Sequence, residues 1–137
     1  MADRIRYTEG YKYQLIGDYT ARLSFTVESE VETRWLHLTP AGFLTIKDGY
    51  AWDGPSGPTL DSKNFMRGSL IHDALYQLMR KRLLSMAYRD DADRELQRVC
   101  LEDGMGSFRA WYVYAGVRFG GGPAADPRRD NPVITAP

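Results

Sequence analysis

The sequence places a histidine beside acidic and aromatic residues whose types and spacing could support hydrolytic chemistry. His72 is followed directly by Asp73, and Tyr76 comes four residues after the histidine. An imidazole can take a proton from water near neutral pH, and a carboxylate behind it would fix its tautomer and stabilise the imidazolium ion. Asp93, in a later acidic group, is a carboxylate that could serve this purpose.

A stiff loop stands upstream of the histidine and reads Trp-Asp-Gly-Pro-Ser-Gly-Pro from Trp52 to Pro58. Proline fixes φ and lacks an N–H, and glycine can adopt positive φ, so we expect a rigid segment whose carbonyl oxygens are not all used in regular hydrogen bonding. Calcium binds roughly six to eight oxygens from carboxylates, carbonyls and water. The loop is either a structural bridge from sheet to helix, which we favour on sequence alone, or a cradle for a hard cation that Asp73 would also bind.

Hydrophobic periodicity predicts an α+β fold. Residues 5–47 alternate apolar and polar side chains in short runs, 22–28 among them, which predicts an antiparallel β-meander with one buried face. Apolar residues then recur at three- and four-residue steps over 62–82 and 91–102, which predicts two antiparallel helices with a short connection. A short third helix over 108–117 and an extended C-terminal tail complete the predicted fold.

The predicted helices determine which candidate side chains can meet. His72 lies inside the apolar stripe of the first helix, and Tyr76 lies one turn further along the same face. Asp73 lies about 100° around that helix, at the border of its apolar face. Asp93 adjoins the apolar stripe of the second helix, so it can face the first helix.

Each of these residues also has a structural interpretation that the sequence leaves open. His72 could be a core histidine bonded to a neighbouring group, and Asp93 could be an acidic residue near the start of a helix capped by Asp90. Asp73 could pair with Arg80 at the surface. The aromatic residues of the third helix, which begin at Phe108, could belong to the core, which we favour, or could meet a membrane surface or a partner.

Length and composition indicate one ordinary globular domain with a tail. The chain has 137 residues, of which 43% are hydrophobic and 26% charged, and its formal net charge is +0. We therefore expect a single domain over 1–122, with no nucleic-acid partner, because nucleic-acid binding usually requires a basic excess. The single cysteine, Cys100, cannot form an internal disulfide and is expected in the core. We expect neither a signal peptide nor a transmembrane segment.

Residues 123–137 form a proline-rich tail that should not fold alone. Order in such a tail usually requires a neighbouring surface. The tail is therefore expected to contact another subunit, either a different protein or a second copy of this chain.

The His-Asp segment and its loop resemble the two-helix core of phospholipase A2, particularly the small cysteine-free versions in parvoviral capsid proteins. The match consists of the His-Asp-x-x-Tyr pattern of 72–76, the Ala-Asp pair that ends at Asp93, and the loop that begins Trp52-Asp-Gly-Pro. The similarity covers roughly residues 50–100, and it differs in the loop, where Pro55-Ser56 stands in place of Pro-Gly.

This resemblance implies a role for each candidate residue. His72 would be the general base and Asp93 its orienting carboxylate, with Tyr76 completing the catalytic set. Calcium would be bound by Asp73 and by main-chain oxygens near the loop residues Trp52, Gly54 and Ser56. Such a site would hydrolyse a lipid ester, which would assist passage through a membrane or lysis.

Most of the chain also resembles a phage-associated family of small proteins of unknown function. The matching features are the Ser56-Gly57-Pro58 loop, the His-Asp-x-x-Tyr helix and the run Arg89-Asp-Asp-Ala-Asp93. This resemblance implies a virion component, associated with tail or capsid, that is located in the virion or the host cytoplasm. Its expected partners are other phage structural proteins or itself, and contact with a membrane surface is an open alternative. Whether the His-Asp site is catalytic or structural stays open on sequence alone.

Overall fold

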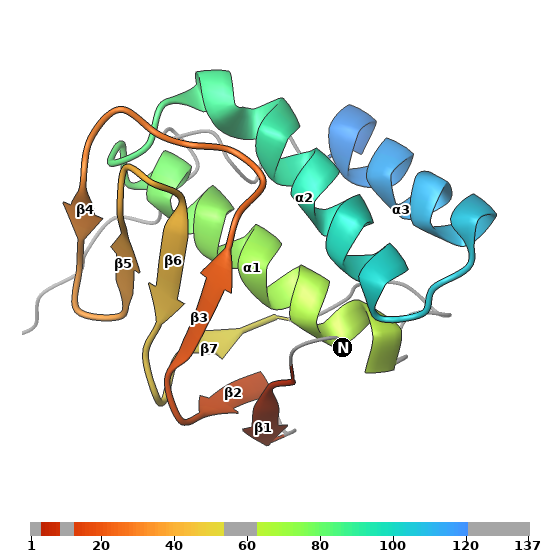
Figure 1. The fold of residues 1–137 in the computed structure, drawn as a ribbon, viewed down its shortest axis with the longest axis horizontal. Helices are drawn as coiled ribbons and strands as arrows, with labels where there is room; N and C mark the ends of the chain where they lie inside the picture. Colours follow the sequence, from red (N-terminus) through yellow and green to blue (C-terminus); the bar gives the residue numbers. More distant parts are fainter. Residues whose placement is uncertain (1–3, 9–12, 54–62, 121–137) are drawn as a thin grey trace, which may run out of the picture.

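The computed structural model describes residues 4–8, 13–53 and 63–120, and these residues have the predicted α+β fold (Figure 1). Short antiparallel strands come first and helices follow. The strands are β1 (Arg6–Thr8), β2 (Tyr13–Ile16), β3 (Tyr19–Arg22), β4 (Val31–Glu32), β5 (Leu36–Leu38), β6 (Phe43–Ile46) and β7 (Ala51–Trp52). The helices are α1 (Lys63–Arg80), the short 3₁₀ turn η1 (Met86–Tyr88), α2 (Arg89–Glu102) and α3 (Ser107–Gly120). The predicted tail over 123–137 lies outside the described residues.

The strands are divided between two small antiparallel sheets. One has the order β1-β2-β7, and the other has the order β3-β6-β5-β4. In the second sheet, Leu36 is opposite Ile46 and Leu38 is opposite Leu44. Residues directly opposite each other share a face of the sheet, so these four side chains form one continuous apolar surface.

The segment 22–28, which alternates like a strand, leaves the sheet after Arg22. Leu23 and Val27 are still buried, and their N–H groups donate to Gly42 and Pro40 at 2.8 and 3.1 Å. Ser24 between them donates its N–H to the Glu95 carboxylate of α2 at 3.2 Å instead of to a strand. The predicted alternation of buried and exposed side chains is therefore confirmed. Ser24, however, bonds to α2 where a regular strand would pair with its neighbouring strand.

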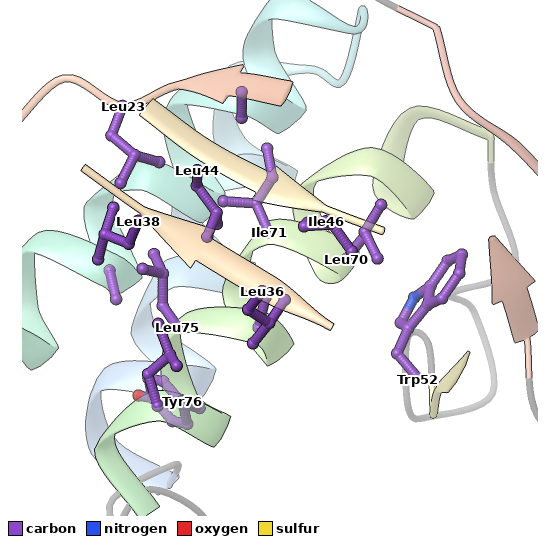
Figure 2. Close-up of a cluster of buried hydrophobic side chains, with 14 of the residues drawn as sticks. Leu23, Leu36, Leu38, Leu44, Ile46, Trp52, Leu70, Ile71, Leu75 and Tyr76 are labelled. Atoms are coloured by element: carbon purple, nitrogen blue, oxygen red, sulfur yellow. The ribbon is translucent and has the colours of Figure 1, made fainter. Parts of the chain in front are cut away.

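The core lies between this apolar sheet surface and α1. Figure 2 shows Leu36, Leu38, Leu44 and Ile46 packed over side chains of the helix. Their helix partners include Leu70, Ile71 and Leu75, and none of these seven side chains is more than 1% exposed. Complete burial of such a side chain stabilises the fold by about 1.5–3 kcal/mol, so this contact holds α1 firmly against the sheet.

The helices form successive layers behind that sheet. Figure 1 shows α2 beside α1 and running in the opposite direction, as predicted, with α3 on the outer side of α2. Gly68 permits the close approach of α1 and α2, because a Cβ at this position would lie 3.0 Å from both Cys100 Sγ and Leu96 Cδ1. Cys100 is fully buried in this contact, as predicted, and burial raises the pKa of its thiol to about 12.

Candidate active site

His72 and Asp93 meet between α1 and α2. His72 projects from α1 toward α2, where its Nε2 lies 2.7 Å from Asp93 Oδ1. This distance confirms the prediction that the imidazole and the later aspartate are hydrogen-bonded. The histidine is 5% exposed and the aspartate is completely buried. The contact arises because both residues lie on the facing surfaces of two antiparallel helices.

Tyr76 joins the same carboxylate from the next turn of α1. Its hydroxyl donates to Asp93 Oδ1 at 2.5 Å, and its ring centroid lies 4.1 Å from that of His72. Burial first, and then the hydrogen bond to Asp93, raise the pKa of Tyr76 above its ordinary range. The phenol therefore stays a proton donor to the carboxylate. Tyr76, which the sequence placed in the catalytic set, is thus a direct partner of Asp93.

Two arginines compensate the charge of the buried carboxylate. Asp93 Oδ2 has no hydrogen-bond partner within the described part of the chain. Nitrogens of Arg89 and Arg118 each lie 3.9 Å from it. A buried carboxylate is stable only when neighbouring positive charges or hydrogen-bond donors offset its lost hydration. The two guanidinium groups and the two donors on Oδ1 together supply this compensation.

Arg89 also connects α3 to the site. Its Nε donates to the Tyr76 hydroxyl at 3.2 Å, and its Nη2 donates to the carbonyl oxygens of Val117 and Arg118 at 3.1 and 2.6 Å. The last turn of α3 therefore closes over the Asp93 side of the pair. Sequence reasoning did not assign Arg89 to the site, although its position four residues before Asp93 is the spacing of a helical ion pair. No pattern in the sequence pointed to Arg118.

The hydrogen-bond partners determine the tautomer of His72. A carboxylate can only accept, so the imidazole Nε2 carries the hydrogen that it donates to Asp93. In the neutral ring, Nδ1 is then the proton acceptor. It faces Asp73, whose Oδ1 lies 4.0 Å away and whose side chain is 34% exposed. The accepting nitrogen thus faces the partly exposed Asp73, whereas the donating nitrogen faces the buried Asp93.

Asp73 belongs to α1, and Asp53 directly follows β7, where the predicted cation loop begins. Burial raises the pKa of Tyr50 most, the Asp73 and Asp53 carboxylates raise it further, and Arg80 opposes them. Both carboxylates thus act on Tyr50, and carboxylate oxygens are donors of the kind that calcium binds. Asp53 was not assigned to the site from the sequence.

The remaining predicted calcium ligands are only partly described. Trp52 is buried, and its indole Nε1 donates to Ser69 Oγ at 3.0 Å. Gly54 and Ser56, whose main-chain oxygens were predicted to bind the ion, lie outside the described residues. Among residues 4–8, 13–53 and 63–120, no three His, Cys, Asp or Glu side chains are grouped as metal ligands would be. The predicted site would thus depend on main-chain oxygens of the loop.

The structural alternative for Asp93 assumed that Asp90 caps the second helix, and this assumption is wrong. Helix α2 begins at Arg89, and its N-cap is Tyr88, whose side chain makes no capping bond. Asp90 lies within the first turn and accepts hydrogen bonds from Arg94 and Tyr114, each at 2.8 Å. These bonds, that of Arg94 first, lower the pKa of Asp90.

Comparison of the chain with protein-family models, with curated proteins and with solved structures found no match. Within the described ranges, no helix is both long enough and apolar enough to cross a membrane.

Proposed function

We propose that the chain is a hydrolase in which His72 is the general base and Asp93 its orienting carboxylate. The observation that carries the proposal is the orientation of the imidazole ring. Its Nε2 lies 2.7 Å from buried Asp93, and its Nδ1 faces Asp73, which is about one-third exposed. In this arrangement Nδ1 removes a proton from water while the water oxygen attacks an ester carbonyl, and the imidazolium then gives that proton to the departing alcohol oxygen as the acyl C–O bond breaks. Asp93 stabilises the imidazolium that forms, and Tyr76 and the two arginines hold Asp93 in place.

The proposed substrate class is a lipid ester, and the proposed cofactor is calcium. Both come from the resemblance to phospholipase A2. The Asp73 and Asp53 carboxylates, which both raise the pKa of Tyr50, support the proposal of a cation near them. Asp73 would bind the ion with carbonyl oxygens of Trp52, Gly54 and Ser56, and the bound ion would polarise the ester carbonyl.

The first experiment compares hydrolysis of phosphatidylcholine–phosphatidylglycerol vesicles, with calcium or a chelator, by wild-type protein and two histidine variants. Loss of a general base lowers a rate by about 10²–10⁴-fold, so His72→Asn should be nearly inactive. His37→Asn is the matched control, because His37 is the other histidine of the chain and bonds to Glu30 on the sheet, away from the site. Calorimetric calcium titration of wild type and Asp73→Asn tests the cation site separately. No hydrolysis and no calcium binding by the wild type would refute the proposal.

A second candidate function is a virion component located in the virion or the host cytoplasm, in which the same cluster only ties helices together. The burial of His72 and Asp93, and the bonds from Arg89 to α3, favour this alternative because they join all three helices. Its proposed partners are other phage structural proteins or a second copy, bound through residues 123–137. Loss of incorporation into virions on deletion of 123–137 would support it, and absence of the protein from purified particles would contradict it.

A further inference from the structure

Helix α3 turns its large aromatic side chains away from the protein. Phe108, Trp111, Tyr112 and Phe119 are 77%, 54%, 66% and 87% exposed. Their spacing of three, four and seven residues places them on one face of the helix. The predicted core position is wrong for Phe108, Trp111 and Tyr112. We call these four residues the aromatic face.

The opposite face of α3 carries the small residues that pack on α2. Ala110 and Val113 are buried there, and Val117 packs against the same cluster. The short side chains let α3 pack against Leu96 and Cys100 of α2. Packing among residues 4–8, 13–53 and 63–120 therefore explains the small residues and does not explain the aromatic face. Exposed apolar patches of this kind mark interaction surfaces.

The charges around the aromatic face favour a negatively charged partner. The sequence of α3, SFRAWYVYAGVRFG, contains two arginines and no aspartate or glutamate. Helical geometry places Arg109 on one border of the aromatic face and Arg118, which also pairs with Asp90 at 3.3 Å, on the other. A partner for this helix must therefore accept aromatic rings at its centre and arginine side chains at its borders.

We propose that the aromatic face is a docking surface for a bilayer that contains anionic lipid. Trp and Tyr rings are favoured at the boundary of headgroups and acyl chains, and arginine is attracted to anionic headgroups. Figure 1 shows α3 at the outer edge of the molecule, on the side of α2 away from α1. A helix with one exposed apolar face can lie in the plane of a lipid interface. The inference does not rest on the proposed hydrolytic function.

Vesicle sedimentation tests the docking surface with phosphatidylcholine vesicles prepared with and without phosphatidylglycerol. The wild-type protein should sediment with the anionic vesicles and much less with the neutral ones. Removal of two exposed rings takes away apolar area that the bilayer would bury, so the double variant Phe108→Ser/Phe119→Ser should bind the anionic vesicles at least about tenfold more weakly. The emission of Trp111 should also shift to shorter wavelength on binding, measured as the difference from Trp111→Phe.

Phe43→Ser is the matched control, because Phe43 is 42% exposed on β6 and lies outside the aromatic face. It should bind vesicles like the wild type, and so should His72→Asn, which separates docking from catalysis. Failure of the wild type to bind anionic vesicles, or equal weakening by Phe43→Ser, would overturn the proposal. The proposal would also be overturned if the wild type were a dimer that does not bind vesicles and if the double variant were a monomer. The aromatic face would then bind a second copy of the chain.

Discussion

At the scale of single residues, the site depends on one carboxylate oxygen of Asp93 that accepts hydrogen bonds from two donors. Asp93 Oδ1 accepts from His72 and Tyr76 at 2.7 and 2.5 Å. Removal of either donor leaves a buried acceptor less satisfied, at a cost of about 1–3 kcal/mol in the free energy of unfolding. A catalytic variant here will therefore also lose stability. Activity must be compared at temperatures where both proteins are folded.

Two buried tyrosines predict loss of stability at alkaline pH. Burial raises the pKa of Tyr76 and Tyr50 in the folded protein, and hydrogen bonding to Asp93 adds to the effect at Tyr76. A raised folded-state pKa gives stability that is complete below the unfolded pKa, about 10, and that is lost as pH rises through the folded value. Between the unfolded pKa of about 10 and the raised folded pKa, the free energy of unfolding should fall by about 1.4 kcal/mol per pH unit for each such tyrosine.

Thermal unfolding at about pH 8 and about pH 11 checks this expectation. The melting temperature should be several degrees lower at the higher pH. Tyr76→Phe, which has no phenolic proton to lose, should show a smaller difference between the two pH values. An equal difference in wild type and Tyr76→Phe would show that Tyr76 does not contribute.

At the scale of elements, the contact between α1 and α2 sets the geometry of the site. His72 and Tyr76 come from α1, Asp93 from α2, and Gly68 lies one turn before the histidine, where the helices approach closely. The spacing between these helices therefore controls the distance between the imidazole and the carboxylate.

Gly68→Ala should destabilise the protein and disturb the site. The added Cβ would lie 3.0 Å from Cys100 Sγ and from Leu96 Cδ1, and both of these residues are buried in the contact. Overpacking costs about 1–3 kcal/mol, whereas the helix gains only about 0.5–1 kcal/mol from replacing glycine. Urea unfolding should show a net loss of about 1 kcal/mol. Gly116→Ala on α3 is the control, because no atom lies within 4 Å of its added Cβ, and any loss there as large as at Gly68 would contradict the argument.

At the scale of the whole molecule, local patterns predicted the elements well. The stripe over 62–82 corresponds to α1 (Lys63–Arg80), and the stripe over 91–102 corresponds to α2, which begins two residues earlier. Because both helices have a single apolar stripe, their antiparallel contact and the meeting of His72 with Asp93 followed from periodicity.

Other features depend on contacts that no local pattern contains. Arg118 lies near Asp93 where α3 packs on α2, and Ser24 bonds to Glu95 of α2 instead of to a neighbouring strand. The aromatic residues of α3 were misassigned because a large apolar ring favours burial, but its size does not show whether this chain or a partner buries it. The small residues Ala110 and Val113 were the better signal of the packed face.

The position of the proton on His72 tests its proposed role as general base. Long-range ¹H–¹⁵N correlation spectra of the histidine side chains, recorded at about pH 8, distinguish the two neutral tautomers. His37→Asn assigns the remaining signals to His72. We expect a hydrogen on Nε2, donated to Asp93, and an unprotonated Nδ1 that can accept a proton from water. A neutral ring with its hydrogen on Nδ1 would contradict the proposed role of His72 as general base.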